Sequence, residues 1–266
     1  MKNILTEIIE HKKTEVAERK ELHPVKLLEK SIYFDSTPVS LRKYLQRPDK
    51  IGVIAEIKRR SPSKGDINKY ISVEQLSLGY MQAGASALSI LTDSKFFGGK
   101  TDDLTTGRRF NFCPILRKDF MVDPYQVIEA KSIGADVILL IAAAISPEST
   151  KELAALAKSL GMEVLLEVHN EREIETHVCE DIDLLGVNNR DLTTFTVSTA
   201  VSEALVDKIP SHLIKITESG ISDAETILRL KKLGYQGFLI GETFMKTPKP
   251  EATCRTLIEQ VEALQG

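Results

Sequence analysis

Charged residues stand directly at the ends of several short apolar segments of this sequence. Lys58 and Lys118 occur at two of these ends, with Glu56 and Glu167 as candidate partners. A charge beside a buried segment is costly unless an opposite charge pairs with it. Such Lys/Glu groupings separate pKa values, so that one group can donate a proton and another can accept one. The pattern predicts acid–base chemistry, and a Schiff-base lysine remains the alternative.

Small and polar residues follow the later apolar segments. Asn188 and Arg190 follow one of them, Glu218–Gly220 lies at the end of the next, and Gly241 follows the last. Glycines let main-chain N–H groups approach an anion, and a helix N-terminus adds positive potential. We therefore expect a phosphate to bind at Gly220 and Gly241, with ordinary turn glycines as the alternative.

A basic loop follows Lys58. It spans residues 59–65 and reads Arg-Arg-Ser-Pro-Ser-Lys-Gly, with Ser61 near its middle. Such a loop can close over an anionic substrate, and we expect Ser61 to contact that substrate. A solvated surface loop is the alternative.

Eight apolar segments must position these residues, and each is followed by a longer segment of helical pattern. The apolar segments do not alternate with polar residues, as is typical of strands covered on both faces. Their spacing of roughly 20–35 residues fits one strand, one helix and two short loops. We predict an α/β fold, a single (β/α)8 TIM barrel. The predicted strands are Ile51–Ile57, Ala87–Leu91, Phe112–Leu116, Val137–Ile141, Glu163–Leu166, Leu184–Val187, Leu213–Ile216 and Phe238–Ile240.

The barrel explains why the polar residues follow the strands, because its chemistry lies at the carboxyl ends of the strands. A doubly wound open sheet is the structural alternative, but the glycine-rich turn that usually follows its first strand is missing here. Capping residues mark the helices between the strands. Predicted N-caps are Ser72, Asp123 and Ser146, with a capping box at Ser222 and Glu225, and predicted C-cap glycines are Gly134, Gly161 and Gly234.

The first 48 residues have a polar, helical pattern. Ile4, Leu5, Ile8 and Ile9 recur at helical spacing. On this pattern alone we expect a surface helix docked on the core, with a cap over the site as the alternative. Because no low-complexity linker interrupts the chain, we place residues 1–266 in one domain with 1–48 as its helical extension.

Composition narrows the classes of function. The chain has 266 residues, 42% of them hydrophobic, and its 35 basic and 38 acidic residues give a net charge of −3. This balance argues against a broad nucleic-acid or membrane surface. The three cysteines lie far apart without a CxxC motif, as expected of reduced thiols in a cytoplasmic protein. No HExxH or Cys/His cluster occurs, so we expect no metal, and His169 is expected to be a capping residue or a supporting residue of the site rather than a catalyst.

The residues at the strand ends form motifs that resemble those of the indole-3-glycerol-phosphate synthase family. The resemblance runs in order from about residue 5 to residue 260, and its first, second and fourth motifs are specific to that family. The motifs are Ala55–Ser63, Ile115–Phe120, Leu166–His169, Gly186–Leu192, Glu218–Ile221 and Ile240–Glu242.

The resemblance implies a reaction of tryptophan biosynthesis that needs neither a cofactor nor a metal. 1-(2-Carboxyphenylamino)-1-deoxyribulose 5-phosphate would give indole-3-glycerol phosphate, carbon dioxide and water. Lys118 resembles the general acid of ring closure, and Glu167 the group that handles protons in the dehydration. Glu56 matches the carboxylate that holds the lysines. Lys58 matches a residue that meets the substrate's carboxylate or phosphate, and that can also donate a proton.

The resemblance also implies the binding residues and a helical cap over the barrel mouth. One departure concerns Glu242, where the family often has a small hydroxyl residue. Since a carboxylate repels phosphate, we expect only the main-chain N–H of Glu242 to bind, with its side chain turned away. The implied polar groups are Asn188, Arg190, Glu218 and Ser219, the phosphate turns hold Gly220, Gly241 and Glu242, and the apolar walls are Phe96, Phe120, Leu139 and Leu192.

The sequence leaves two other functions open. A phosphoribosylanthranilate isomerase or similar sugar-phosphate isomerase would want an acid–base pair such as Asp/Cys rather than two lysines at strand ends. A non-catalytic barrel could bind a phosphorylated ligand without turnover, although Lys118 and Glu167 are both present. In each case we expect a phosphorylated small molecule as the partner, and a monomer or weak homodimer.

Overall fold

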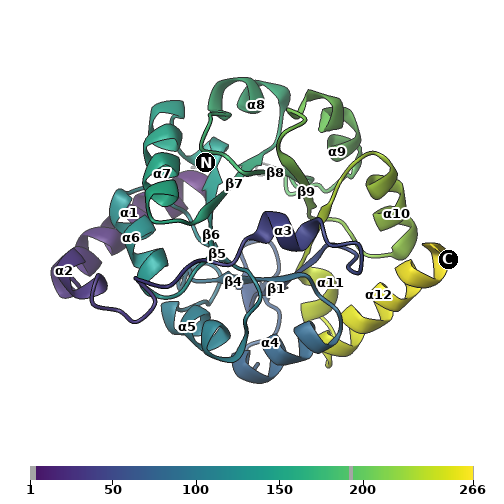
Figure 1. The fold of residues 1–266 in the computed structure, drawn as a ribbon, viewed down its shortest axis with the longest axis horizontal. Coiled ribbons are helices and arrows are strands. Elements are labelled where there is room, and N and C mark those ends of the chain that lie inside the picture. The colour runs from purple at the N-terminus through teal and green to yellow at the C-terminus, as the bar shows by residue number, and fades with distance from the viewer. Residues whose placement is uncertain (1–3, 192–193, 266) are drawn as a thin grey trace.

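Parallel strands close into a barrel at the centre of the molecule (Figure 1). The structure is a computed structural model that describes residues 4–191 and 194–265. Each strand pairs with the strand that follows it in the barrel, and the last pairs with the first. This confirms the predicted TIM barrel. Its strands are β1 (Val53–Ile57), β4 (Ala87–Leu91), β5 (Ile115–Lys118), β6 (Val137–Ile141), β7 (Glu163–Val168), β8 (Leu184–Asn188), β9 (Ile214–Glu218) and β10 (Gly237–Ile240).

Helices surround the barrel and cover the outer face of the strands (Figure 1). The principal helices are α4 (Val73–Gln82), α5 (Thr101–Phe110), α6 (Pro124–Ser132), α7 (Pro147–Ser159), α8 (Glu171–His177), α9 (Ala200–Leu205), α10 (Ala224–Lys232) and α12 (Pro250–Gln265). Shorter elements are η1 (Ala142–Ala144), η2 (Val206–Lys208), α11 (Glu242–Met245) and the ribbon β2 (Arg60–Ser61) with β3 (Gly65–Asp66).

Predicted capping residues mark several of these helix boundaries. Ser72, Asp123 and Ser146 accept hydrogen bonds from main-chain N–H groups at the starts of α4, α6 and α7. The three predicted C-cap glycines, Gly134, Gly161 and Gly234, all have positive φ, the conformation that glycine adopts without strain.

The capping prediction at Ser222 is wrong. Asp223 is the N-cap of α10, and its carboxylate accepts from the N–H of Thr226 at 2.8 Å. Ser222 instead donates to Asp223, because the carboxylate one residue later lies closer to the first free amides.

The start of the third predicted strand also needs correction. β5 begins at Ile115 rather than at Phe112, and the Phe112 side chain is 92% exposed. Pro114 has no N–H for the ladder, so pairing begins only after it. The strand instead continues to Lys118.

Alternation along the strands explains what lies inside the barrel. Successive side chains of a strand point to opposite faces, so residues two apart share a face. Ile54, Leu116, Leu165 and Ile216 are buried in one apolar cluster inside the barrel. The residues two positions later on the same strands are Glu56, Lys118, Glu167 and Glu218. The charged groups therefore lie directly above the inner apolar cluster, at the carboxyl ends of the strands.

The N-terminal extension lies at both ends of the barrel rather than only over its mouth. α1 (Ile4–Leu22) reaches the mouth, where Ile4, Leu5 and Ile8 line the pocket described below. α2 (Val25–Leu28) follows beside α6, and α3 (Leu41–Leu45) crosses the opposite end (Figure 1). Leu41 and Leu45 are buried in the inner apolar cluster. The expected cap is thus α1, while α3 closes the floor.

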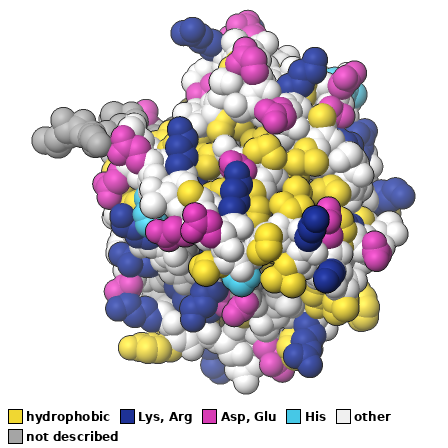
Figure 2. All heavy atoms as spheres, turned by 90° about the vertical axis from the view of Figure 1, so that its left-hand side faces the viewer, with side chains coloured by type: hydrophobic (Ala, Val, Ile, Leu, Met, Phe, Trp, Pro, Cys, Tyr) yellow, Lys and Arg dark blue, Asp and Glu magenta, His cyan; other side chains and the backbone are white. Residues whose placement is uncertain are grey.

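The outer surface carries charges of both signs. On the side that holds α1, α2, α6 and α7, basic and acidic side chains are interspersed around apolar ones (Figure 2). The described part of that side therefore presents no continuous basic surface of the kind that binds nucleic acid. Among the helices within residues 4–191 and 194–265, none is long and apolar enough to cross a bilayer.

Candidate active site

The barrel mouth holds a pocket of about 540 Å³. All eight strands of the barrel contribute lining residues, together with α1 and the loops after β1, β8, β9 and β10. This volume lies in the range of pockets for small-molecule ligands, which is roughly 300–1,000 Å³. The pocket is therefore large enough for a sugar phosphate attached to one aromatic ring.

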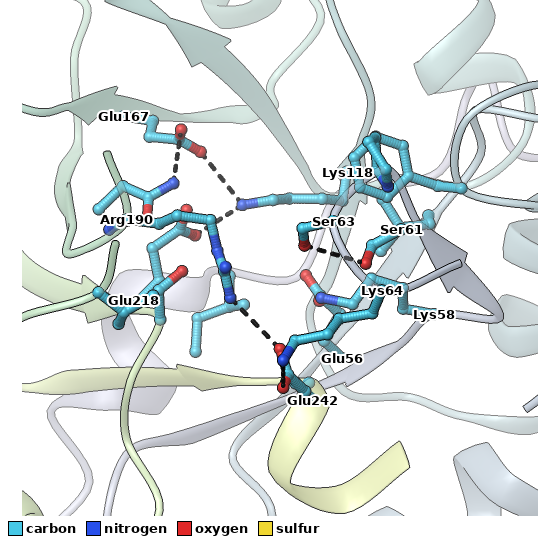
Figure 3. A pocket seen from close by; sticks show the side chains of 18 of the residues that line it. Glu56, Lys58, Ser61, Ser63, Lys64, Lys118, Glu167, Arg190, Glu218 and Glu242 are labelled. Carbon is cyan, nitrogen blue, oxygen red and sulfur yellow. Dashed lines mark hydrogen bonds and ion pairs between the residues drawn. The ribbon is translucent and has the colours of Figure 1, made fainter. Parts of the chain in front are cut away.

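Lys118 lies between two carboxylates on the pocket wall (Figure 3). Its Nζ donates to Oε2 of Glu218 at 2.6 Å and to Oε2 of Glu167 at 3.2 Å. All three side chains are nearly buried, with Lys118 the most exposed at 14%. We call these three residues the mouth cluster. They come from β5, β7 and β9, so the barrel itself brings them together.

Burial and pairing shift the pKa values of the mouth cluster in different directions. Burial and the neighbouring charge of Glu167 raise the pKa of Glu218. Burial alone would also raise the pKa of Glu167, but Lys118 and His169 lower it. Although burial opposes its charge, the carboxylates raise the pKa of Lys118. At neutral pH the cluster thus presents an ammonium group, an ionised Glu167 and a protonated Glu218.

Lys58 and Glu56 form a second pair in the same pocket. Nζ of Lys58 donates to Oε1 of Glu56 at 2.6 Å. The carboxylate of Glu56 packs directly against Gly241, where a Cβ atom would lie 2.3 Å from Oε1 of Glu56. Only glycine leaves room there. The close approach therefore fixes the position of the turn after β10 and that of Glu56, the partner of Lys58.

The turn after β9 has an unusual backbone. Ser219 and Gly220 both have positive φ, at 68° and 75°. Ser219 is not a glycine, so its conformation carries strain of the kind often kept at functional sites. Both residues line the pocket, and Gly241 and Glu242 line it from the neighbouring strand end. The three residues expected in the phosphate turns, together with Ser219, therefore face one space.

Glu242 holds two basic side chains across the mouth. Its Oε2 lies 3.3 Å from a guanidinium nitrogen of Arg190, and its Oε1 lies 3.7 Å from Nζ of Lys64 (Figure 3). Glu242 begins α11 after β10, while Arg190 and Lys64 lie in the segments after β8 and β1. The side chain thus bonds to basic groups at the mouth, and Lys64 is a pocket residue that sequence reasoning placed only within a basic loop.

Asn188 links the mouth cluster to the loop after β8. Its Nδ2 donates to Oε1 of Glu167 at 3.0 Å, and its Oδ1 accepts from the main-chain N–H of Arg190 at 3.0 Å. One amide side chain therefore orients both Glu167 and the start of the loop that carries Arg190.

Apolar side chains form the remaining walls. Phe120 and Leu139 line the pocket as expected. Phe96 does not line it, since its ring packs edge-on against His11 at 5.8 Å, and the adjacent Phe97 lines the pocket instead. Both phenylalanines lie in a loop, where the alternation of side chains along a strand does not predict which of the two rings points into the pocket. Leu192 lies outside the described residues.

The loop after β1 contributes the residues at its tip to the pocket lining, but not its first arginine. Ser61, Pro62, Ser63 and Lys64 line the pocket. The guanidinium of Arg59 instead forms a salt bridge with Asp103 on α5. Ser61 thus lies in the lining of the pocket. Within the described residues, no group of three or more His, Cys, Asp or Glu side chains is arranged to hold a metal ion.

Known proteins resemble this chain along nearly its whole length. The family model for indole-3-glycerol phosphate synthase matches residues 5–257. An indole-3-glycerol phosphate synthase from Bacteroides thetaiotaomicron is 46% identical over 262 residues, which cover 98% of this chain and 100% of that protein. Another from Caldanaerobacter subterraneus is 41% identical, covering 91% of this chain and 93% of that protein.

Solved structures share the fold at low sequence identity. A tryptophan synthase structure from Pyrococcus furiosus aligns with a TM-score of 0.59 at 15% identity, covering 81% of this chain and 99% of that one. A KGPDC structure from Streptococcus mutans aligns with a TM-score of 0.61 at 11% identity, with the same coverage. These likenesses concern the barrel alone. The family model and the curated relatives go further, and they show that the chain belongs to the indole-3-glycerol phosphate synthase family.

Proposed function

We propose that the pocket converts 1-(2-carboxyphenylamino)-1-deoxyribulose 5-phosphate to indole-3-glycerol phosphate, carbon dioxide and water, a carboxy-lyase reaction of tryptophan biosynthesis. The observation that carries this proposal is the mouth cluster, in which a buried lysine lies 2.6 and 3.2 Å from two carboxylates beside a ring-sized apolar wall. The membership of the chain in the family supports the same reaction.

Lys118 is the general acid of ring closure in this proposal. The substrate's ring carbon that bears the carboxylate attacks the ketone carbon, and the carbonyl oxygen gains negative charge as the bond forms. The ammonium of Lys118 stabilises that charge and delivers a proton to the oxygen. Glu218, at 2.6 Å from Nζ, holds the ammonium in place and, when protonated, returns a proton to it.

Loss of carbon dioxide then restores the aromatic ring, and loss of water completes the indole. The second step removes a proton from the carbon beside the nitrogen while the hydroxyl group leaves with a proton. Glu167 is ionised, and Lys118 and Asn188 orient it, so it suits the role of base. Lys58 lines the same pocket and can donate the proton with which the hydroxyl group departs.

The phosphate occupies the side of the mouth formed by β9 and β10. Main-chain N–H groups at Gly220, Gly241 and Glu242 supply donors, and Lys58 supplies a charge. The side chain of Glu242 stays bonded to Arg190 and Lys64 rather than turning to the phosphate. Phe97, Phe120 and Leu139 hold the aromatic ring, and Asn188, Arg190, Ser61 and Ser219 contact its polar groups.

A turnover assay with two substrates tests the proposal. Purified protein is supplied separately with the ribulose and the ribosyl forms of the anthranilate adduct, and the indole product is followed by its fluorescence. We expect the indole from the ribulose form only. Conversion of the ribosyl form alone would indicate the isomerase, and binding of the ribulose form without turnover would indicate a non-catalytic barrel.

We further propose that residues 1–266 act as one domain with residues 1–48 as its extension, and that the protein works in the cytoplasm as a monomer or weak homodimer. Contacts of α1 with the mouth and of α3 with the floor support a single unit. The substrate is a small phosphorylated molecule, and the proposed chemistry calls for no cofactor.

A further inference from the structure

His169 lies behind the mouth cluster, outside the residues that line the pocket. It follows β7 directly, two residues after Glu167. Its Nε2 is buried without a hydrogen-bond partner and lies 3.6 Å from Oε1 of Glu167. On its other side, Nδ1 lies 3.4 Å from Oε2 of Glu173, which also accepts from the main-chain N–H of His169 at 2.7 Å. The imidazole therefore stands between two carboxylates.

The positions of the two ring nitrogens decide the charge of this imidazole. A neutral histidine has one N–H and one lone pair, so one nitrogen would place its lone pair against a carboxylate oxygen. Only the doubly protonated ring directs an N–H at both Glu167 and Glu173. The hydrogen bond to Glu173 and the charges of the carboxylates raise the pKa of His169, although burial alone would lower it.

We propose that His169 is a positioning residue for the reaction, held by Glu173 and directed at Glu167 so that it fixes the orientation and charge of that carboxylate. This inference rests on the proposed function, in which Glu167 is the base. Glu167 is then held from three directions, by Lys118 on Oε2 and by Asn188 and His169 on Oε1. Of these three partners, Lys118 and Asn188 line the pocket and His169 does not, so His169 can act without touching the substrate.

The surroundings of His169 leave few other groups to account for its charge. Glu167 faces it from β7, Glu173 from α8 and Glu218 from β9. η1 packs against both β7 and α8, and it contributes only alanines. Asn170 donates to Oε1 of Glu173 at 2.8 Å, which leaves Oε2 directed at the histidine.

The test measures kcat and KM between pH 3 and 9 for the wild type and for His169→Asn, because the pKa of Glu167 lies well below its usual range in the wild type. Without the imidazolium, Glu167 loses a neighbouring positive charge and its pKa rises, so the acid limb of kcat moves to higher pH. We expect kcat to fall about tenfold to a hundredfold, the same range as for removing a group that orients a metal-binding side chain, with little change in KM. An unchanged acid limb with a normal kcat would overturn the inference.

Two further variants separate positioning from folding. His177→Asn is the matched control, because His177 is a buried histidine on α8 that contacts the carbonyl of Ile145 at 3.1 Å outside the pocket. It should lower stability and leave the acid limb in place. Glu173→Gln should move the acid limb in the same direction as His169→Asn. It should have no further effect in the His169→Asn background, since it acts through the histidine.

The outcomes also separate this inference from the proposed function. If the wild type forms no indole product, the proposed function falls and the inference falls with it. If the wild type is active but Glu173→Gln leaves the pH profile unchanged, the proposed function stands and the role of His169 is wrong. Should His169→Asn fail to fold, Glu173→Gln alone still decides the question.

Discussion

Two clusters of buried charge meet at strand β5. The mouth cluster, Lys118 with Glu167 and Glu218, faces the pocket. The neighbours of Lys118 in sequence belong to a second cluster that ties the strand to the helices around it. We call this second group the outer cluster, and it consists of Lys12, Asp93, Arg117, Asp119 and Glu129.

The side chains of the outer cluster are buried, and none of them is more than 6% exposed. Lys12 of α1 is 1% exposed and lies 2.9 Å from both Asp93 and Asp119. Arg117 bonds to Glu129 of α6 at 2.6 Å and to Asp119 at 3.3 Å. Lys12 thus ties α1 to Asp119 at the end of β5, and the outer cluster fastens α1 over the mouth.

The difference between the clusters lies in access rather than in residue type. Both hold buried lysines and carboxylates, but all three residues of the mouth cluster line the open pocket, whereas Asp119 alone of the outer cluster does. A buried ion pair is weak evidence for either stability or function by itself. What distinguishes a candidate catalyst is a paired charge that a substrate can still reach. Substitutions in the two clusters, and one on the phosphate side of the mouth, test this distinction.

Lys118→Ala gives the largest expected effect on activity. Removing the general acid should lower kcat by about two to four decades. Stability should change little, because Glu167 and Glu218 face the pocket and can take up protons. Steady-state turnover and a thermal melt check both parts, and a kcat equal to that of the wild type would remove Lys118 from the mechanism.

Lys12→Met should show the opposite pattern. The substitution leaves Asp93 and Asp119 buried without their shared cation, and breaking a buried pair in this way costs about 3–5 kcal/mol. Urea unfolding measures the loss, while kcat below the unfolding temperature should change far less than in Lys118→Ala. A loss of activity as large as that of Lys118→Ala would show that the clusters do not differ in role.

Gly241→Val tests the phosphate side of the mouth. A Cβ atom at this position lies 2.3 Å from Glu56, so the turn must shift away from the phosphate. Loss of one hydrogen bond to a charged group should raise KM about tenfold. Gly234→Val is the control, since Gly234 has positive φ but lies outside the pocket. An unchanged KM in Gly241→Val would place the phosphate elsewhere.

The smallest expected effect is a shift in acid stability. Burial alone would raise the pKa of Asp119, but Lys12 and Arg117 lower it to about 2. An unfolded aspartate has a pKa of about 3.9, so this carboxylate stabilises the fold above that pH and loses its contribution as pH falls towards 2. In Lys12→Met the folded pKa rises, and the acid midpoint of unfolding should move up by about one unit.

Circular dichroism followed from pH 6 to pH 2 measures that midpoint. Ile227→Ala, a core variant on α10, corrects for a general loss of stability because Ile227 is buried among apolar residues. If Ile227→Ala shifts the midpoint as far as Lys12→Met does, the shift does not arise from Asp119.

The sequence predicted the mouth cluster because local rules determine it. Lys118, Glu167 and Glu218 each lie near the carboxyl end of an apolar strand, and the alternation of side chains along the strand places them on the inner face. The capping residues that begin α4, α6 and α7 are equally local.

The outer cluster escaped sequence reasoning because it depends on distant contacts. Lys12 meets Asp119 across more than a hundred residues, and no short pattern records that pairing. The choice between Phe96 and Phe97 was missed because both lie in a loop. The position of α3 at the barrel floor could not be predicted either, since its apolar residues fit any core.

A crystal structure with bound indole-3-glycerol phosphate tests the central claim most directly. The account predicts the indole ring against Phe120 and Leu139, with the mouth cluster beside it. It also predicts that the phosphate accepts hydrogen bonds from main-chain N–H groups at Gly220 and Gly241. A phosphate bound to Lys118, or a product bound outside the barrel mouth, would contradict it.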